Sequence, residues 1–228
     1  MRKKNNIMVA YYAKSKPLES FSEKELNLIA DELENKSVSI GEDVKKYLKK
    51  LSNKYNGVLI GLDKMYKSRE RILQKLKRNK YPRDVLRFTI LFSENNYLCS
   101  SLGLFNDIIK YKSVQFDPIN IKQRWDLGDY YQGINMSYTW ENIPWELQIH
   151  TIRSLKSKSG KTHKIYETYQ KHKCDKRKTK KCKKLKQELL NIEKRVPIPK
   201  GMRKQLTRKL ICKKNNKSCK KLKCINLN

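Results

Sequence analysis

The sequence contains no long apolar run. No stretch approaches the roughly 20 consecutive apolar residues that a membrane-spanning helix needs. The N-terminal residues 1–6 are polar or basic apart from Met1, and only the short apolar run Ile7–Ala10 follows them, whereas a secretory signal peptide has a longer apolar core. We therefore expect a soluble chain with no membrane span and a cytoplasmic, intracellular location. Release as an effector or toxin stays open as an alternative.

The six cysteines include no CxxC pair, which is the close spacing that zinc ribbons and fingers usually present. Cys99 lies in an apolar region and is expected to be a buried thiol. The other five lie in the last third of the chain: Cys174, Cys182, Cys212, Cys219 and Cys224. For these five we expect free or loosely paired thiols in preference to a zinc site, and metal binding by them stays open.

Acidic residues are scarce, above all in the last third of the chain. The sequence has 22 Asp and Glu against 54 Lys and Arg, a formal net charge of +32. Residues 152–228 hold 28 of the basic residues and only 4 of the acidic ones, while residues 1–151 keep an ordinary globular balance. This excess favours polyanionic partners such as nucleotides, RNA or DNA. The alternative is that a Lys- and Asn-rich chain reflects only a biased genome.

Apolar periodicity predicts helices and strands in alternation. A capping box at Ser22–Glu25 starts a helix over 22–34, and apolar spacing predicts a second helix over 40–51, after a break at 35–39. Further helices are predicted over 68–78, 98–109 and 163–171. Strands are predicted over 58–62, 84–92 and 113–116, with a hairpin formed by 133–140 and 143–150.

This order of elements predicts an α+β fold with a mixed β-sheet flanked by helices. We divide the chain into an N-terminal helical segment, residues 1–54, a core domain, residues 55–170, and a Lys/Cys-rich basic extension, residues 171–228. The segment 171–186 is of low complexity, so it is either a very basic helix or disordered until it meets an anion.

Two carboxylates fall in strand-like apolar runs. Asp84 starts one run, and Glu146 lies inside another, where strand alternation places Glu146, Gln148 and His150 on one face. If the two strands are neighbours, Asp84 and Glu146 form a site for Mg²⁺, which proteins typically hold with one or two carboxylates plus substrate phosphates. An exposed sheet face lined with polar groups explains the pattern equally well.

Cations that could bind phosphates recur at helical spacing. Lys67, Arg71 and Lys75 recur every four residues, at and just before the helix predicted over 68–78, so we expect them to share one helix face. A bound anion would relieve the repulsion between these three cations. Lys122 and Arg124 form a second candidate clamp. A solvated basic surface is the alternative for both groups. Tyr131 precedes a Gly-containing strand start and could stack on a base.

Five segments, in the same order, resemble the synthetase domains of the RelA/SpoT family over about residues 55–170. Lys67–Leu76 resembles their ATP-phosphate-binding helix, and Asp84–Arg87 resembles the strand that starts with their metal-binding Asp. Tyr131–Asn135 is similar to the segment whose Tyr stacks on the acceptor base. Trp145–Thr151 is close to the strand that carries the catalytic Glu, and His163–Tyr166 looks like the His-x-x-Tyr pair of the next helix. The variant is most similar to divergent, toxin-associated members.

The resemblance implies a nucleotidyltransferase-like fold and a synthetase-only pyrophosphokinase. Such an enzyme transfers pyrophosphate from ATP to the 3′-hydroxyl of a guanosine or adenosine nucleotide or of an RNA end. The resemblance implies that Asp84 and Glu146 bind Mg²⁺ and take part in catalysis, and that Glu146 also acts as the general base. The nucleotide-binding residues that we carry over or add are Lys67, Arg71, Lys75, Lys122, Arg124, Tyr131, Asn135, Gln148 and His163.

Two alternatives stay open. A nucleic-acid-binding protein could keep the fold without catalysis, which the basic last third favours. Another nucleotidyltransferase could add a nucleoside monophosphate to RNA or protein. Retention of both carboxylates favours an enzyme, because a protein that binds only polyanions gains nothing electrostatically from acids in its pocket.

Overall fold

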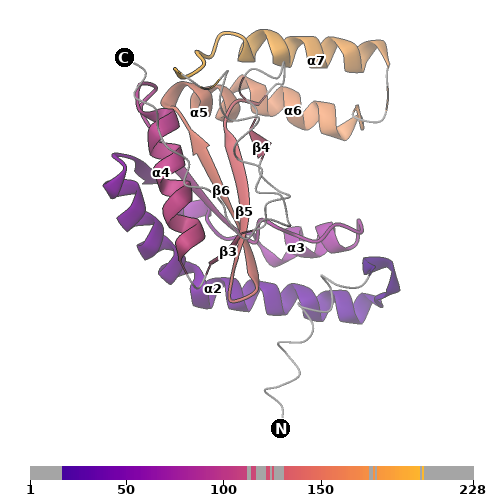
Figure 1. Cartoon of the computed structure of the whole chain (residues 1–228). Coiled ribbons are helices and arrows are strands. Elements are labelled where there is room, and N and C mark those ends of the chain that lie inside the picture. Colours follow the sequence, from indigo (N-terminus) through magenta and orange to yellow (C-terminus); the bar gives the residue numbers. More distant parts are fainter. Residues whose placement is uncertain are drawn as a thin grey trace, which may run out of the picture.

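The computed structural model describes residues 17–111, 114–116, 122–123, 125, 131–174, 177, 179–200 and 202 (Figure 1). The helices are η1 (Leu18–Ser20), α2 (Glu23–Lys54), η2 (Leu62–Lys64), α3 (Arg69–Leu76), α4 (Tyr97–Lys110), α5 (Ile152–Ser159), α6 (Lys161–Lys171) and α7 (Lys180–Glu193). The strands are β1 (Val58–Ile60), β2 (Leu86–Leu91), β3 (Val114–Phe116), β4 (Lys122–Gln123), β5 (Ile134–Trp140) and β6 (Ile143–His150). The predicted α+β class with one mixed sheet is confirmed.

The sheet has the strand order β1-β2-β6-β5-β3, and β4 also pairs with β5. β2 and β6 run parallel at its centre, and the other neighbouring strands are antiparallel. The predicted hairpin is present: β5 and β6 are joined at Glu141 and Asn142, whose φ values of 50° and 68° suit a two-residue turn that matches the strand twist. The parallel pairing of β2 with β6 brings the two acid-bearing segments together.

One face of the sheet is apolar and packs against helices. Trp145, Leu147 and Ile149 of β6 are fully buried on it, as strand alternation predicts. α2 and α4 lie along one side of the sheet, while α5, α6 and α7 gather at its upper end in the view (Figure 1). Tyr97 of α4 donates from its hydroxyl to the Ile149 carbonyl, 2.7 Å away, which ties α4 to the central strand. The central strand β6 is therefore fixed to α4 through its backbone.

The predicted break between two N-terminal helices is wrong. α2 is one helix of 32 residues that begins at the predicted capping box of Ser22 and Glu25. Within the expected break, Ser37 is buried and donates to the Glu34 carbonyl at 2.7 Å, a bond that is compatible with helix geometry. Gly41 also stays helical, and a Cβ there would lie 2.5 Å from the Tyr66 hydroxyl. Tertiary packing of the apolar stripe overrides the weak local propensity.

Two other predictions need correction. β1 is an edge strand, not a buried one: it pairs only with β2 among the described strands, and Val58 is 61% exposed. The predicted helix over 163–171 is present as α6, but a helix that was not predicted precedes it. This helix, α5, starts directly at the Thr151 cap, where the side chains of Thr151 and Ser154 each accept from the other residue's backbone N–H. The remaining predicted helices and strands are present with shifted ends.

The basic last third is partly folded onto the rest of the protein. α7 packs on α6 through a small apolar cluster of Ile165, Tyr169, Cys174, Cys182 and Leu189. Beyond α7, Val196 and Met202 join the main core. The predicted domain boundary at residue 170 therefore runs through packed structure, and of the two options for residues 171–186 the described part from Lys180 onward is helical.

The expectation of free or loosely paired thiols is wrong for the described cysteines. Cys174 and Cys182 form a disulfide that closes the turn between α6 and α7. Cys99 is also disulfide-bonded and is exposed, so it is not a buried thiol. Spacing alone could not show this, because a disulfide depends on the distance between Cα atoms, here 5.2 Å.

Reduction of the Cys174–Cys182 bond should loosen α7. Closing a loop with a sequence separation of 8 restricts the unfolded chain, which by loop entropy stabilises the folded form by about 2–3 kcal/mol. Amide hydrogen exchange in α6 and α7 should speed up correspondingly in dithiothreitol, with little change in β2 or β6. A Cys174→Ser, Cys182→Ser variant should show the same faster exchange without reductant. If the amide hydrogen exchange rates were unchanged both in reductant and in the variant, apolar packing alone would hold α7 against α6.

In the part of the chain that the structure describes, no helix combines the length and the apolar character required to cross a membrane.

Candidate active site

A polar face covers the centre of the sheet. The strand register aligns Arg87 of β2, Glu146 of β6 and Ser137 of β5 in one row. The next row aligns Thr89, Gln148 and Asn135. Side chains in register on neighbouring strands project to the same side of a sheet. We call these six residues, together with His150 at the end of β6, the polar face.

Asp84 lies two residues before β2 and is surrounded by cations. Its Oδ2 lies 2.5 Å from Lys67 Nζ and 2.8 Å from a terminal nitrogen of Arg87, and its Oδ1 lies 2.8 Å from Lys75 Nζ. Lys67 is positioned by the pairing of its backbone N–H with the Val85 carbonyl. Two of the three predicted phosphate-binding cations therefore meet the predicted metal-binding Asp.

The charge around Asp84 shifts its protonation. Asp84 is 6% exposed, and burial by itself would raise the pKa of its carboxyl group. The ion pairs and hydrogen bonds from Lys67 and Lys75 outweigh burial and hold the pKa well below the usual range. The carboxylate is thus ionised at neutral pH, and one carboxylate faces three cations. The excess positive charge suits an anionic ligand such as a polyphosphate.

Arg87 links Asp84 to Glu146. Its Nε lies 3.2 Å from Glu146 Oε1, while its guanidinium also contacts Asp84. The same Glu146 oxygen accepts from the Gln148 side-chain amide, and Lys158 of α5 donates to the Gln148 carbonyl oxygen. The two predicted catalytic carboxylates are therefore bridged by one guanidinium, with Asp84 just before β2 and Glu146 on the neighbouring strand β6.

Lys158 is an additional cation at this site. Its Nζ lies 5.2 Å from the centre of the Tyr131 ring, and burial, reinforced by Arg87, lowers the pKa of Lys158 to about 8. The sequence offered no signal for Lys158, because it lies in a Ser- and Lys-rich stretch after β6. Arg87 was foreseen only as part of the Asp84 segment, because its approach to Glu146 depends on the pairing of β2 with β6.

Tyr131 is held by its own set of contacts. Its hydroxyl donates to Asn135 and lies 2.9 Å from His150 Nε2, and its ring meets the His150 ring edge-on at 5.3 Å. Burial lowers the pKa of His150 to about 3, so its imidazole is neutral. A Cβ at Gly133 would lie 2.7 Å from His150 Cε1, which explains the Gly in the Tyr131–Asn135 segment. The contacts bring Tyr131, Asn135 and Gln148 to the same face as Glu146.

Of the other four predicted nucleotide-binding residues, Arg71 and His163 do not join these contacts, and the side chains of Lys122 and Arg124 lie outside what the structure describes. Arg71 is exposed on α3 and forms no ion pair with a described residue. His163 is exposed on α6, where its Nε2 lies 3.2 Å from Glu167. The backbone of Lys122 pairs with Asn135 next to the polar face. Arg124 lies outside the described residues.

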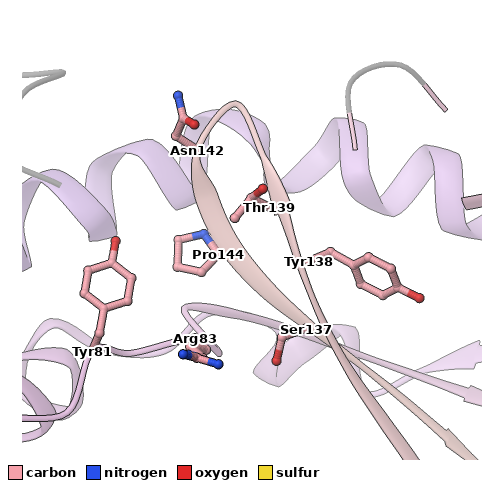
Figure 2. A pocket seen from close by; sticks show the side chains of 7 residues that line it. All are labelled: Tyr81, Arg83, Ser137, Tyr138, Thr139, Asn142 and Pro144. Atoms are coloured by element: carbon pink, nitrogen blue, oxygen red, sulfur yellow. The ribbon is translucent and has the colours of Figure 1, made fainter. Parts of the chain in front are cut away.

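A pocket adjoins the polar face at the tip of the β5–β6 hairpin. It is lined by Tyr81, Arg83, Ser137, Tyr138, Thr139, Asn142 and Pro144. Figure 2 shows Tyr81 and Arg83, from the segment before β2, facing the hairpin. Ser137 is opposite Glu146 in the strand register, so the pocket begins beside that carboxylate.

The carboxylate pair fits the predicted magnesium ion. The described residues contain no group of three or more His, Cys, Asp or Glu that could hold a metal alone. Mg²⁺ needs only one or two carboxylates when substrate phosphates complete its shell. Asp84 and Glu146 supply hard oxygens, and the Arg87 guanidinium already places a positive charge between them. Arg87 is 46% exposed at its side chain, so it can turn toward solvent and make room.

Taken together, these groups can bind a polyphosphate and accept a proton. Lys67, Lys75 and Arg87 face the Asp84 carboxylate, and Ser137, which is opposite Glu146 in the strand register, lines the pocket. Phosphoryl-type transfer needs mainly positioning and charge neutralisation of this kind. No model of a known protein family matches the sequence, and no curated protein matches it either.

Proposed function

We propose that this protein is a RelA/SpoT-like pyrophosphokinase on a nucleotidyltransferase-like fold. It transfers pyrophosphate from ATP to the 3′-hydroxyl of a nucleotide or of an RNA end. The observation that carries the proposal is the meeting of Lys67, Lys75 and Asp84 with Arg87 and Glu146 on one face. These groups come from sequence segments up to 79 positions apart, and all but Arg87 were assigned catalytic, metal or phosphate roles from the sequence.

Each group has a chemical role in the proposed reaction. Lys67 and Lys75 bind the phosphates of ATP and neutralise charge as it develops. Glu146 takes the proton of the acceptor 3′-hydroxyl, whose oxygen attacks the β-phosphorus while the bond to the α-phosphate breaks and AMP leaves. Asp84 and Glu146 would hold Mg²⁺, which when bound supplies further charge neutralisation at the phosphates. Gln148 orients Glu146 through its amide N–H.

The direct test is incubation with labelled ATP, Mg²⁺ and a panel of acceptors. ATP labelled at the β- or γ-phosphate should give labelled acceptor and unlabelled AMP. ATP labelled at the α-phosphate should leave the acceptor unlabelled. Transfer of the α-label would instead show a nucleoside-monophosphate transferase, and no transfer to any guanosine, adenosine or tRNA acceptor would favour a binding protein.

The donor also bears on location. ATP is plentiful in the cytoplasm, and we propose cytoplasmic action on that ground. The Cys174–Cys182 disulfide points the other way, because such bonds persist mainly in oxidising compartments. Release from the cell of origin as an effector reconciles the two, with the disulfide formed before delivery.

Replacing Lys67 or Lys75 by Ala should weaken ATP binding. Each change removes one cation that lies within 2.8 Å of Asp84, and a charge-assisted hydrogen bond contributes about 1.5–3 kcal/mol, which is about 10- to 100-fold in affinity. The measurement is calorimetric titration with a non-hydrolysable ATP analogue. Lys80→Ala, an exposed Lys just beyond α3, is the matched control and should bind normally. Normal affinity in both site variants would leave the cations as structural partners of Asp84.

A second activity, polyanion binding, is favoured by the surface of α7. Its five lysines are all exposed: Lys180, Lys181, Lys183, Lys184 and Lys186. None of them forms an ion pair with another residue in the described ranges, so their charge faces solvent. The excess of Lys over Arg argues for diffuse attraction without bidentate base reading. We propose that this surface binds RNA largely without sequence preference.

Changing these five lysines to Gln should weaken RNA binding and flatten its salt dependence. Each phosphate contact that is lost should reduce the log–log salt slope by about 0.7 on single strands. This variant is preferable to truncation after Gln170, which would remove the packed helix α7. Fluorescence anisotropy with single-stranded RNA at two salt concentrations gives the slopes. Equal affinity and slope in variant and parent would assign the lysines to solubility.

A further inference from the structure

The ring of Tyr131 is already engaged in the protein. Lys158 Nζ lies over the ring at 5.2 Å, the His150 ring meets it edge-on, and the hydroxyl is bonded to Asn135. A base that stacked on the Lys158 side would have to displace that cation. The resemblance to the RelA/SpoT family implies that the acceptor base stacks on the ring of Tyr131. The contacts that this ring already makes within the protein disfavour such stacking. The acceptor base therefore needs another surface close to Glu146.

The pocket at the hairpin tip offers such a surface. Ser137 lies opposite Glu146, and Thr139 follows two residues later on the same side of β5, about 7 Å further along the strand. Tyr138, between them, turns its ring to the other side, where it stacks on Trp145 at 4.6 Å. The pocket floor is thus formed by two hydroxyls and by Pro144, and it leads away from Glu146.

Three other residues that line the pocket carry groups that recognise a base. Arg83 and Tyr81 come from the segment before β2, and Asn142 comes from the hairpin turn (Figure 2). A guanidinium plane and a phenol ring both stack on bases, and an amide can hydrogen-bond to a base edge. Arg83 is also exposed and adjacent in sequence to Asp84, so its position is tied to the phosphate-binding cluster.

We propose that this pocket binds the nucleoside of the acceptor, with its ribose beside Ser137 and Glu146 and its base beside Arg83 and Asn142. The proposal rests on the proposed function for the placement of the 3′-hydroxyl at Glu146. The phosphates of ATP would bind at Lys67 and Lys75, which both contact Asp84. In-line transfer then requires the acceptor oxygen to approach the β-phosphorus opposite the oxygen that leaves with AMP.

Binding of adenosine or guanosine 5′-monophosphate, compared with ribose 5-phosphate, tests the pocket without relying on catalysis. The nucleotide should bind about 5- to 150-fold more tightly than the sugar phosphate, because base stacking contributes about 1–3 kcal/mol. Arg83→Ala should remove most of this preference. Asn142→Gly, which suits the φ of 68° at that position and removes the amide, should reduce it and alter the order of the two bases. Arg153→Ala, an exposed Arg paired with Glu94, should leave the preference unchanged.

The outcomes separate the pocket from the proposed function. A base preference that survives in Arg83→Ala and Asn142→Gly but is lost in Tyr131→Leu, with the fold checked by thermal melting, overturns the pocket and places the base on Tyr131. Absence of any base preference in the parent protein also overturns it. Binding that depends on Arg83, together with no label transfer from ATP, supports the pocket while the pyrophosphokinase proposal fails.

Discussion

Replacing Glu146 by Gln is expected to lower the rate of pyrophosphate transfer by about 10²- to 10⁴-fold, the usual cost of losing a general base. Gln keeps the shape of the side chain, and its amide oxygen can still accept from Gln148 and Arg87, the two partners of Glu146. It cannot take a proton from the acceptor hydroxyl or serve as an anionic metal ligand. The loss should therefore appear in kcat with the fold intact.

The measurement is label transfer from ATP under single-turnover conditions, with thermal melting as the check on folding. Glu94→Gln, which changes a carboxylate near the start of α4, is the matched control and should transfer at the parent rate. Near-normal turnover of Glu146→Gln would exclude Glu146 both as the general base and as a required metal ligand.

Replacing Asp84 by Asn is expected to abolish transfer and also to destabilise the protein. The change removes the charge that compensates Lys67, whose side chain is only 12% exposed, and breaking a buried pair by removing one partner costs about 3–5 kcal/mol. Lys75 and Arg87 are 40% and 46% exposed, so they can turn to solvent and should add little. We expect the lower end of that range in a urea unfolding titration.

The pH dependence of the free energy of unfolding should also report the ionisation of Asp84. Because the pKa of Asp84 is depressed in the folded protein, its ion pairs contribute stability above the unfolded-state pKa of about 3.9. That contribution is lost as the pH falls below this value toward the folded-state pKa. The parent protein should therefore lose stability steeply below about pH 4, and Asp84→Asn should lose less over the same interval.

A double variant separates the two roles of Asp84. Lys67→Met with Asp84→Asn removes both charges of the buried pair and should recover part of the stability, since no unpaired charge is then left buried. Transfer activity should stay absent, because the metal-binding carboxylate and a phosphate-binding cation are both missing. Recovery of activity along with stability would make Asp84 a structural residue only.

Local sequence patterns predicted the site better than they predicted the helices around it. The spacing of Glu146, Gln148 and His150 gave their common face, because strand alternation depends only on backbone geometry. Lys67 and Lys75 do both reach Asp84, but not from a shared helix face, because α3 begins at Arg69 and the Lys67 backbone pairs with Val85 instead. The helix break at 35–39 was predicted from local propensity, and it is absent because α2 gains more from one continuous apolar stripe.

Contacts between distant segments could not be predicted in this way. The Arg87 bridge from Asp84 to Glu146, the approach of Lys158 to Tyr131 and Gln148, and the Cys174–Cys182 bond depend on which elements pack together. None of them leaves a periodic signal in the chain. The pocket at the hairpin tip is of the same kind, since Arg83 and Asn142 line one pocket only because β2 lies next to β6.

The sequence by itself determined the α+β class, the central strands with their two faces, and the charge asymmetry of the chain. These properties follow from side-chain period, turn chemistry and composition, all of which are local. Only the tertiary structure decided that β2 and β6 run parallel side by side, because strand pairing is a long-range choice set by the packing of the apolar face. That pairing makes one cluster of Asp84, Glu146 and their cations, from which both the proposed reaction and the acceptor pocket derive.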